Sequence, residues 1–225
     1  MSEKSRHIEQ DITAEEIPGA GKKEKREQRA SLGPSQEIIR FIETYRDEFQ
    51  PGDEVLELGV GEGRNLEAFQ DPKLNLHGIE LDPQGVEMCR QRMAEKGIEA
   101  DIKEGSFTDL SAFKDGSMKV VFSQYAIQNA RTWEDIQNIF TEIRRVLKPT
   151  GLYFFREQKY PFIKDADRQR RVAYFTKEEI QQLADQFSLE IIEDKTPIKT
   201  RDDPQRVGGK QVVWDLVFRK KPESK

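Results

Sequence analysis

The stretch VLELGVGEGRN, residues 55–65, decides the fold predicted for this chain. Its first half is an apolar run that suits a buried strand, and its second half carries glycines at positions 59, 61 and 63. A strand that leads through a glycine-rich turn into a helix is typical of an open α/β sheet, which binds ligands at the carboxyl ends of its strands. Glycine lets the backbone approach a ligand closely and adopt a positive φ. Residues 55–65 therefore predict a first strand followed by a ligand-binding turn.

Two side chains in this stretch indicate which ligand the turn binds. The dinucleotide fingerprint G-x-G-x-x-G would place its third glycine at position 64, where this chain has Arg64. Glu57 ends the strand beside the turn, and a carboxylate there would repel the charges of a pyrophosphate. The same carboxylate suits a cation, such as the ammonium group or the nearby sulfonium of S-adenosylmethionine. The turn therefore favours S-adenosylmethionine over a nicotinamide dinucleotide.

An acidic side chain at the end of the next predicted strand is a second anchor. In HGIELD, residues 77–82, Glu80 falls at the strand tip, where a carboxylate can accept hydrogen bonds from both hydroxyls of a ribose. Asp82 is the rival acid, but it directly precedes Pro83 and better fits the N-cap of a helix. We expect Glu80 to bind the ribose, and a plain capping role is the alternative for either acid.

The apolar pattern alternates along the chain between strand and helix. Repeated strand–helix units predict a doubly wound α/β fold with a mostly parallel sheet and helices on both faces. The strands are expected at 53–59, 74–82, 98–105, 118–124, 152–157, 189–195 and 211–220, the last two as an antiparallel edge pair. The helices are expected at 34–49, 63–70, 83–97, 133–151 and 176–187. A single domain is expected over residues 34–225, preceded by a charged N-terminal tail or lid over residues 1–33.

Composition argues against several classes of function. The chain has 37 basic and 42 acidic residues, a formal charge of −5, which argues against nucleic-acid binding as its main role. With one cysteine, Cys89, and two distant histidines, no disulfide framework or metal site is expected, and Cys89 is expected to pack in a helix. No apolar stretch approaches the ~20 residues that span a bilayer, and the N-terminus lacks the apolar core of a signal peptide. We expect a cytoplasmic monomer or homodimer without membrane contacts.

Four segments resemble the successive motifs of class I S-adenosylmethionine-dependent methyltransferases. In chain order they are LELGVGEGRN, HGIELDP, EGSFTDL and RRVLKPTGLYFFRE. The resemblance covers about residues 50–157, and RVLKPTG followed by an aromatic-rich strand is typical of members that act on small molecules. It implies a seven-stranded sheet of order 3-2-1-4-5-7-6 with an antiparallel last strand. It also implies S-adenosylmethionine as cofactor and S-adenosylhomocysteine as product.

The resemblance further implies roles for individual residues in the cofactor site. Glu57 and the three glycines would line the methionine end, Glu80 would hold the ribose, and Leu81 would pack near the adenine. Ser106 and Phe107 match the pair that flanks the adenine, although many relatives have an acid where Ser106 stands. The set implied for cofactor binding is Glu57, Gly59, Gly61, Gly63, Arg64, Asn65, Glu80, Leu81, Ser106, Phe107 and Gln124.

The acceptor side is less determined by sequence. Methyl transfer is a direct displacement, in which the enzyme mainly aligns the acceptor and excludes water. Gln124 and Tyr125 match the positions that face the methyl group and are expected to position the reactants. The segment SQYA, residues 123–126, differs from the Asn/Asp-Pro-Pro-Tyr/Phe motif of enzymes that methylate amino groups of DNA and some proteins. The expected acceptor-binding residues are Tyr125, Gln128, Asn129, Tyr160, Arg168, Arg171 and Tyr174.

The leading hypothesis is a methyltransferase that moves a methyl group from S-adenosylmethionine to a small molecule. Basic residues within 164–171 would bind an acidic group of that substrate or form a solvated turn. An NAD-dependent oxidoreductase is disfavoured by Glu57 and Arg64. A protein or RNA methyltransferase has only the charged N-terminal segment in its support. A non-catalytic partner-binding protein of the same fold would be expected to have a degraded cofactor site.

Overall fold

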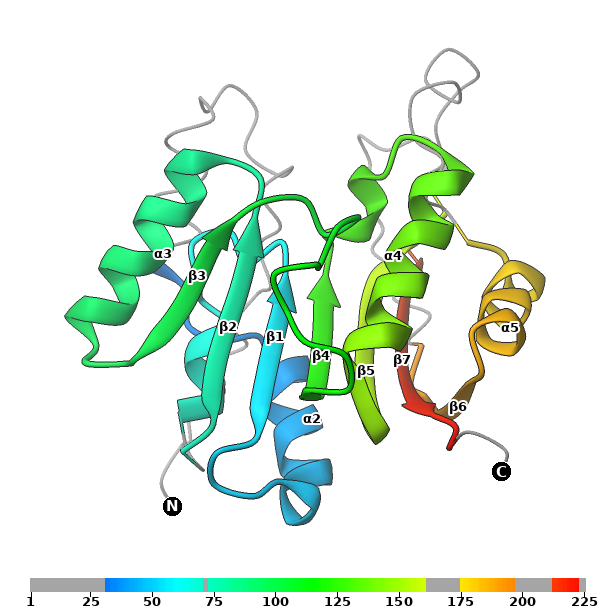
Figure 1. Cartoon of the computed structure of the whole chain (residues 1–225), viewed down its shortest axis with the longest axis horizontal. Coiled ribbons are helices and arrows are strands. Elements are labelled where there is room, and N and C mark those ends of the chain that lie inside the picture. Colours follow the sequence, from blue (N-terminus) through cyan, green and yellow to red (C-terminus); the bar gives the residue numbers. More distant parts are fainter. Residues whose placement is uncertain (1–30, 71–72, 161–174, 197–211, 223–225) are drawn as a thin grey trace, which may run out of the picture.

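A computed structural model describes residues 31–70, 73–160, 175–196 and 212–222 of the chain. Its centre is a seven-stranded sheet of order β3-β2-β1-β4-β5-β7-β6 (Figure 1). The strand β7 runs antiparallel to both of its neighbours, and the other neighbouring pairs are parallel. The strands are β1 Glu54–Leu58, β2 Asn75–Glu80, β3 Ala100–Glu104, β4 Met118–Gln124, β5 Leu147–Tyr160, β6 Leu189–Asp194 and β7 Val212–Lys220. The predicted sheet order and its antiparallel edge pair are confirmed.

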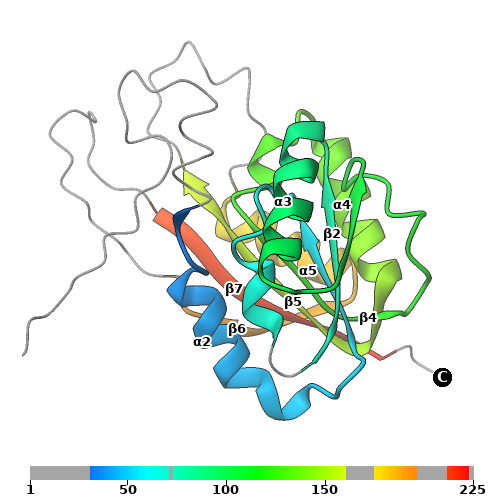
Figure 2. The same ribbon diagram turned by 90° about the vertical axis from the view of Figure 1, so that its left-hand side faces the viewer.

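Helices cover both faces of this sheet, as predicted. The segments α2, η2 and α3 pack on one face with the apolar side chains of one cluster, and α4 and α5 pack on the other. Figure 2 shows α2 and α4 on opposite sides of β5 and β7. Cys89 of α3 is fully buried in the first cluster, and burial raises the pKa of its thiol to about 12. The helical segments are α2 Gln36–Tyr45, η1 Arg46–Glu48, η2 Leu66–Gln70, α3 Pro83–Glu95, η3 Ile127–Asn129, α4 Trp133–Val146 and α5 Lys177–Gln186.

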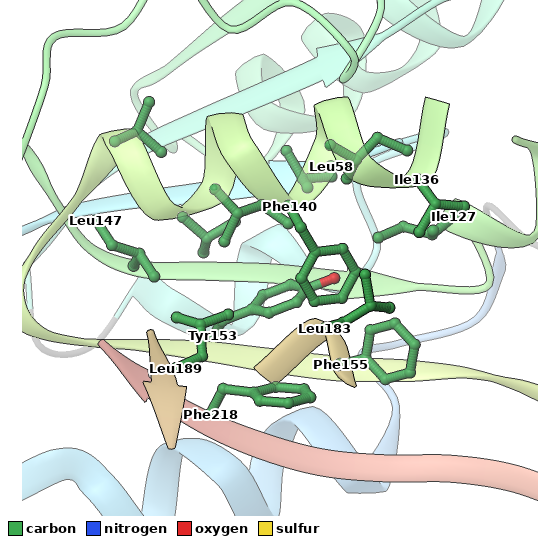
Figure 3. Packing of buried hydrophobic residues seen from close by; sticks show 14 of the residues in the cluster. Leu58, Ile127, Ile136, Phe140, Leu147, Tyr153, Phe155, Leu183, Leu189 and Phe218 are labelled. Carbon is green, nitrogen blue, oxygen red and sulfur yellow. The ribbon is translucent and has the colours of Figure 1, made fainter. Parts of the chain in front are cut away.

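Aromatic packing fixes β5 and β7 beneath α4. The ring of Phe140 in α4 lies 5.9 Å from that of Tyr153 and 6.3 Å from that of Phe155, both in β5 (Figure 3). Its centroid is 6.4 Å from that of Phe218 in β7, in an edge-to-face arrangement. Such contacts add to the stabilisation from apolar burial. They give the two strands that bear Arg156, Glu157 and Asp215 a fixed position.

Some predicted elements differ from the observed ones. The helix expected over 63–70 is observed as a short 3-10 segment, η2, that begins at Leu66; Gly63, the first residue of the expected helix, has a φ of 78°, which is incompatible with a helix. Strand β5 begins earlier than predicted because Leu147 pairs with Met118 before the register shifts, and Leu152 then pairs with Val120.

None of the helices in the described ranges is long and apolar enough to cross a membrane.

Candidate functional site

The glycine turn after β1 has a backbone that requires glycine for two distinct reasons. Gly59 has a φ of 67°, and a Cβ added there would lie 2.7 Å from the Cβ of Ala126. Gly61 has a φ of 53°, but an added Cβ would meet no atom within 4 Å. The first glycine therefore allows close packing against the turn after β4. The second allows the backbone to turn at a position that faces open space, as a ligand-binding turn must.

Glu57 lies beside this turn and is only 3% exposed. Burial raises the pKa of its carboxyl well above the usual range, although the charge of Arg64 and a hydrogen bond from Asn65 lower it. Its Oε2 atom has no hydrogen-bond partner among the described residues. Burying a carboxylate is costly unless a cation or hydrogen-bond donors compensate it. The Glu57 side chain is therefore suited to meet a cationic group of a ligand.

Glu80 and Asp82, the two rival acids, have different positions. The Oε2 of Glu80 accepts a hydrogen bond of 3.0 Å from the amide of Gly61, and its Oε1 accepts one of 2.9 Å from the amide of Asp82. Asp82 instead caps α3, where its Oδ1 accepts a 3.0 Å hydrogen bond from the amide of Gln84. The prediction that Asp82 is an N-cap is confirmed. Glu80 is the acid held against the turn, and each of its oxygens can accept a further hydrogen bond.

The residues expected around an adenine include an exposed apolar side chain. Leu81 is 66% exposed and is the large hydrophobic residue that the described chain leaves in solvent. Phe107 is partly buried against the core, and its Cε1 lies 3.8 Å from the position of a Cβ on Gly59. Ser106 accepts a 3.2 Å hydrogen bond from the amide of Thr108, so its hydroxyl is used within the loop. Leu81 and Phe107 thus follow β2 and β3, on the same sheet edge as the glycine turn.

Gln124 is the last residue of β4, the neighbour of β1 in the sheet, and Tyr125 follows it. Tyr125 has a φ of 58°, which is sparsely populated for a bulky residue and costs about 1–3 kcal/mol. Its amide donates a 2.9 Å hydrogen bond to the carbonyl of Arg156, and the Arg156 guanidinium lies 5.4 Å from its ring centroid. The strained backbone and the cation–π contact together hold Tyr125 in one orientation.

The turn that carries Gln128 and Asn129 is held by Glu157 of β5, which was not among the predicted site residues. Glu157 is fully buried, and its Oε1 accepts hydrogen bonds of 3.1 and 3.2 Å from the amides of Ala126 and Ile127. Its Oε2 accepts a 3.4 Å hydrogen bond from the amide of Gln128. Burial raises the pKa of the Glu157 carboxyl to about 7, although these amides lower it. An acid inside an apolar, aromatic strand was the available sequence signal.

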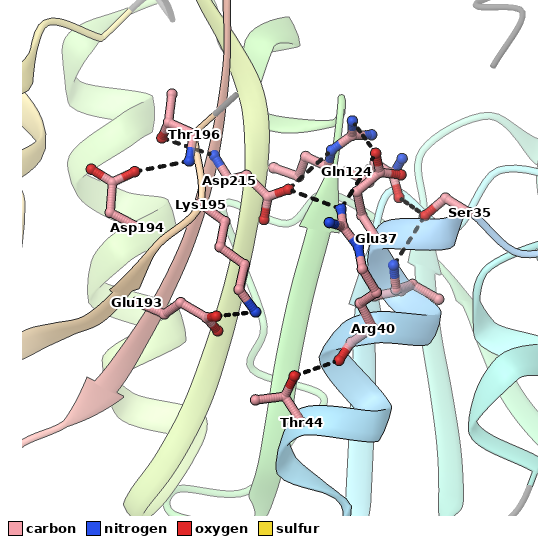
Figure 4. A network of polar contacts seen from close by, with 12 residues as sticks. Ser35, Glu37, Arg40, Thr44, Gln124, Glu193, Asp194, Lys195, Thr196 and Asp215 are labelled. Atoms are coloured by element: carbon pink, nitrogen blue, oxygen red, sulfur yellow. Dashed lines mark hydrogen bonds and ion pairs between the residues drawn. The ribbon is translucent and has the colours of Figure 1, made fainter. Parts of the chain in front are cut away.

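A second missed group links α2 to the sheet beside Tyr125. Arg156 is 2% exposed and donates a 2.8 Å hydrogen bond from Nη2 to Oε1 of Glu37 (Figure 4). Its Nε lies 3.7 Å from Oδ2 of Asp215 in β7. Burial raises the pKa of the Asp215 carboxyl, while the charge of Arg156 lowers it. The cluster fixes α2 against the strands that border the predicted acceptor side.

The structure brings together most of the predicted cofactor residues at the carboxyl ends of β1, β2, β3 and β4, but not every predicted acceptor residue. Gln128 and Asn129 lie in η3, next to Tyr125. Tyr160 ends β5, and Arg168, Arg171 and Tyr174 lie outside the described residues.

Glu157 gives a testable dependence of stability on pH. Its pKa is higher in the folded state, about 7, than the ordinary value of 4.5 expected on unfolding, so the folded state binds the proton more tightly. Its contribution to stability is thus complete below pH 4.5 and is lost as the pH rises to about 7. In Glu157→Gln this titration is absent. We expect the unfolding free energy of the wild type, minus that of the variant, to fall by about 3 kcal/mol across this range.

Urea unfolding of both proteins at several pH values between 5 and 8 measures this difference. The reasoning fails if the difference stays constant or increases with pH.

Comparison with known proteins identifies the fold that carries this site. Residues 56–155 match a family model described as a methyltransferase domain. No curated protein matches the sequence. A solved S-adenosylmethionine-dependent methyltransferase from Methanosarcina mazei is 18% identical with a TM-score of 0.67, over 85% of this chain and 100% of that one.

Two further structures have the same fold. An S-adenosylmethionine-dependent methyltransferase from Clostridium acetobutylicum is 12% identical with a TM-score of 0.65, over 87% of this chain and 95% of that one. Phosphoethanolamine N-methyltransferase 2 from Haemonchus contortus, in complex with phosphomonomethylethanolamine and S-adenosylhomocysteine, is 18% identical with a TM-score of 0.64. That match covers 85% of this chain and 54% of the other. Residues 56–155 therefore match a methyltransferase domain, and the chain has the fold of the class I S-adenosylmethionine-dependent methyltransferases.

Proposed function

We propose that this chain transfers a methyl group from S-adenosylmethionine to a small-molecule acceptor. The observation that carries the proposal is the Oε2 atom of Glu57, which is buried beside the glycine turn and has no hydrogen-bond partner among the described residues. The ammonium group of the methionine moiety would supply the missing partner and the missing charge. A pyrophosphate at the same place would add negative charge next to a buried carboxylate.

The remaining residues of this edge fit the rest of the cofactor in the order of the strands. Glu80, at the end of β2, already accepts hydrogen bonds from the amides of Gly61 and Asp82. The remaining lone pairs of its carboxylate would accept hydrogen bonds from the ribose hydroxyls. The exposed side chain of Leu81 would cover a face of the adenine, and Phe107 would border the adenine from the loop after β3. The fit supports S-adenosylmethionine as the ligand of this site.

The residues after β4 are proposed to serve the methyl transfer itself. When bound, S-adenosylmethionine supplies a methyl group on a sulfonium, which an acceptor lone pair attacks while the carbon–sulfur bonding electrons remain on sulfur. Tyr125 and Gln124 would align the acceptor and exclude water, because alignment is the main requirement of such a displacement. Gln128 and Asn129 would contact the acceptor from η3. Tyr160, Arg168, Arg171 and Tyr174 are proposed to complete that side.

A small-molecule acceptor has the better support among the alternatives. The acidic balance of the chain disfavours a polyanionic substrate such as RNA. A relative of the same fold was solved with phosphomonomethylethanolamine, a small phosphorylated amine. A non-catalytic, partner-binding protein would be expected to have a degraded cofactor site. In this chain Glu57, Glu80 and the glycine turn instead form one connected arrangement.

The two acids after β2 form a matched pair for testing cofactor binding. In Glu80→Ala, the carboxylate proposed to bind the ribose is removed, and we expect the affinity for S-adenosylhomocysteine to fall about 10- to 100-fold. In Asp82→Ala, the side chain that caps α3 is removed, which costs about 1 kcal/mol of stability and should leave the affinity within a factor of about three. Calorimetric titration of each folded protein measures both.

Equal losses in the two variants would contradict the assignment of Glu80 to the ribose. A folded wild type that binds NAD but not S-adenosylhomocysteine would overturn the proposed function itself.

The class of acceptor is tested by following the methyl group. We expect that the protein, given methyl-labelled S-adenosylmethionine and a cell extract divided into small-molecule and macromolecular fractions, labels a product only in the small-molecule fraction. The label that separates chromatographically from S-adenosylmethionine in each fraction, with heat-denatured protein as control, measures this. Label that is recovered in protein or RNA would instead favour a macromolecular substrate.

A further inference from the structure

Ser35, immediately before α2, connects the N-terminal segment to two amide side chains of the cofactor site. It is 2% exposed, and its backbone amide donates a 3.0 Å hydrogen bond to Oδ1 of Asn65. Its hydroxyl donates a 2.9 Å hydrogen bond to Oε1 of Gln124 (Figure 4). The same hydroxyl caps α2 by accepting a 3.2 Å hydrogen bond from the amide of Ile38. The amide and the hydroxyl of Ser35 are thus held by three different partners, Asn65, Gln124 and Ile38.

These bonds determine how the two amides are oriented. The oxygen and nitrogen of a side-chain amide occupy similar space, so the hydrogen-bond partners decide which one faces a given direction. The amide of Ser35 requires the oxygen of Asn65, so Nδ2 of Asn65 turns to Gln124 and donates a 3.1 Å hydrogen bond to its Oε1. Two donors, from Ser35 and Asn65, therefore converge on Oε1 of Gln124. The Nε2 atom of Gln124 therefore points away from Ser35 and Asn65.

As a result, one hydrogen-bond donor and one acceptor, on neighbouring strands, have no partner among the described residues. Nε2 of Gln124, at the end of β4, is buried and has no hydrogen-bond partner among the described residues. Oε2 of Glu57, in the adjacent strand β1, is buried and equally without a partner there. Asn65 bonds to both side chains. Nε2 can donate a hydrogen bond to a carboxylate, and the Glu57 oxygen can accept one from an ammonium group, so the pair complements the two ends of an amino acid.

Two arginines hold the backbone that precedes Ser35. The Nη2 of Arg92 in α3 donates a 2.9 Å hydrogen bond to the carbonyl of Leu32. The Nη1 of Arg64, in the glycine turn, donates a 3.4 Å hydrogen bond to the carbonyl of Gly33. Residues 32–35 are therefore attached to the turn and to α3, at the end of the segment, residues 1–33, that was expected to be a tail or lid. The position of Ser35 does not depend on α2 alone.

We propose that Ser35 is a positioning residue for the amino-acid end of the cofactor. It orients Asn65 and Gln124 so that Nε2 of Gln124 donates to the methionine carboxylate while Glu57 receives the ammonium group. The inference rests on the proposed function, since it takes S-adenosylmethionine as the ligand. It extends that function by making the segment before α2 part of the recognition of the zwitterion.

The test compares two ligands that differ only in this end. S-adenosylhomocysteine carries the amino-acid group, and 5′-methylthioadenosine keeps the adenosine and the thioether without it. In Ser35→Ala, the donor to Gln124 is lost, and we expect calorimetry to show about tenfold weaker binding of S-adenosylhomocysteine. The affinity for methylthioadenosine should stay unchanged. A general loss of structure would weaken both ligands.

Three further variants separate positioning from stability. Ser35→Thr keeps the hydroxyl and should restore the affinity for S-adenosylhomocysteine. Gln124→Glu has nearly the same shape but replaces the donor with a carboxylate oxygen, so it should weaken S-adenosylhomocysteine and spare methylthioadenosine, whether or not Ser35→Ala folds. Thr176→Ala removes the corresponding capping hydroxyl from α5, where Thr176 accepts from the amide of Glu179, and should change neither affinity.

The outcomes distinguish this inference from the proposed function. If Ser35→Ala weakens both ligands equally, or neither, while the wild type binds S-adenosylhomocysteine, the positioning role is wrong and the proposed function stands. If the folded wild type does not bind S-adenosylhomocysteine, the proposed function fails and this inference fails with it.

Discussion

Burial of the Glu57 carboxylate at the end of β1 is the constraint around which this site is organised. A carboxylate that is 3% exposed loses most of its hydration, and burial accordingly raises the pKa of Glu57. The fold supplies partial compensation through the charge of Arg64 and a hydrogen bond from Asn65. The glycine turn brings these groups to Glu57, and Ser35 and Gln124 orient Asn65 in turn. What the described residues leave uncompensated is one oxygen, which a cationic ligand would complete.

Glu157 shows the same problem solved within the protein. It is also fully buried, but both of its oxygens accept hydrogen bonds from the amides of the turn after β4. Its carboxylate therefore stabilises a local backbone conformation, the one that presents Tyr125 at a positive φ. The contrast assigns different roles to two buried acids on neighbouring parts of the sheet. Glu57 has bonding capacity left for a ligand, whereas Glu157 uses its capacity to hold the turn after β4, which carries the predicted acceptor residues Gln128 and Asn129.

The sheet, and the gathering of the expected cofactor residues at one edge of it, were largely predictable because their signals are local. The apolar strands, the glycines beside Glu57 and the proline after Asp82 each specify their own neighbourhood. Glu157 and Ser35 were missed because their partners are distant in sequence: Ala126 is 31 residues from Glu157, and Gln124 is 89 residues from Ser35. Residue types alone do not specify such contacts. The helix expected over 63–70 was wrong since positive φ values in the turn delay helical geometry until Leu66.

The central claim is that the buried carboxyl of Glu57 meets the ammonium group of the cofactor, and proton exchange on binding tests it most directly. Because burial favours the protonated form of Glu57, an ammonium group placed against it should lower its pKa and release a proton. Calorimetric titration with S-adenosylhomocysteine near neutral pH, in buffers of different ionisation enthalpy, counts the protons exchanged. The account predicts that the wild type releases more protons than Glu57→Gln. Equal proton exchange by the two folded proteins would contradict it.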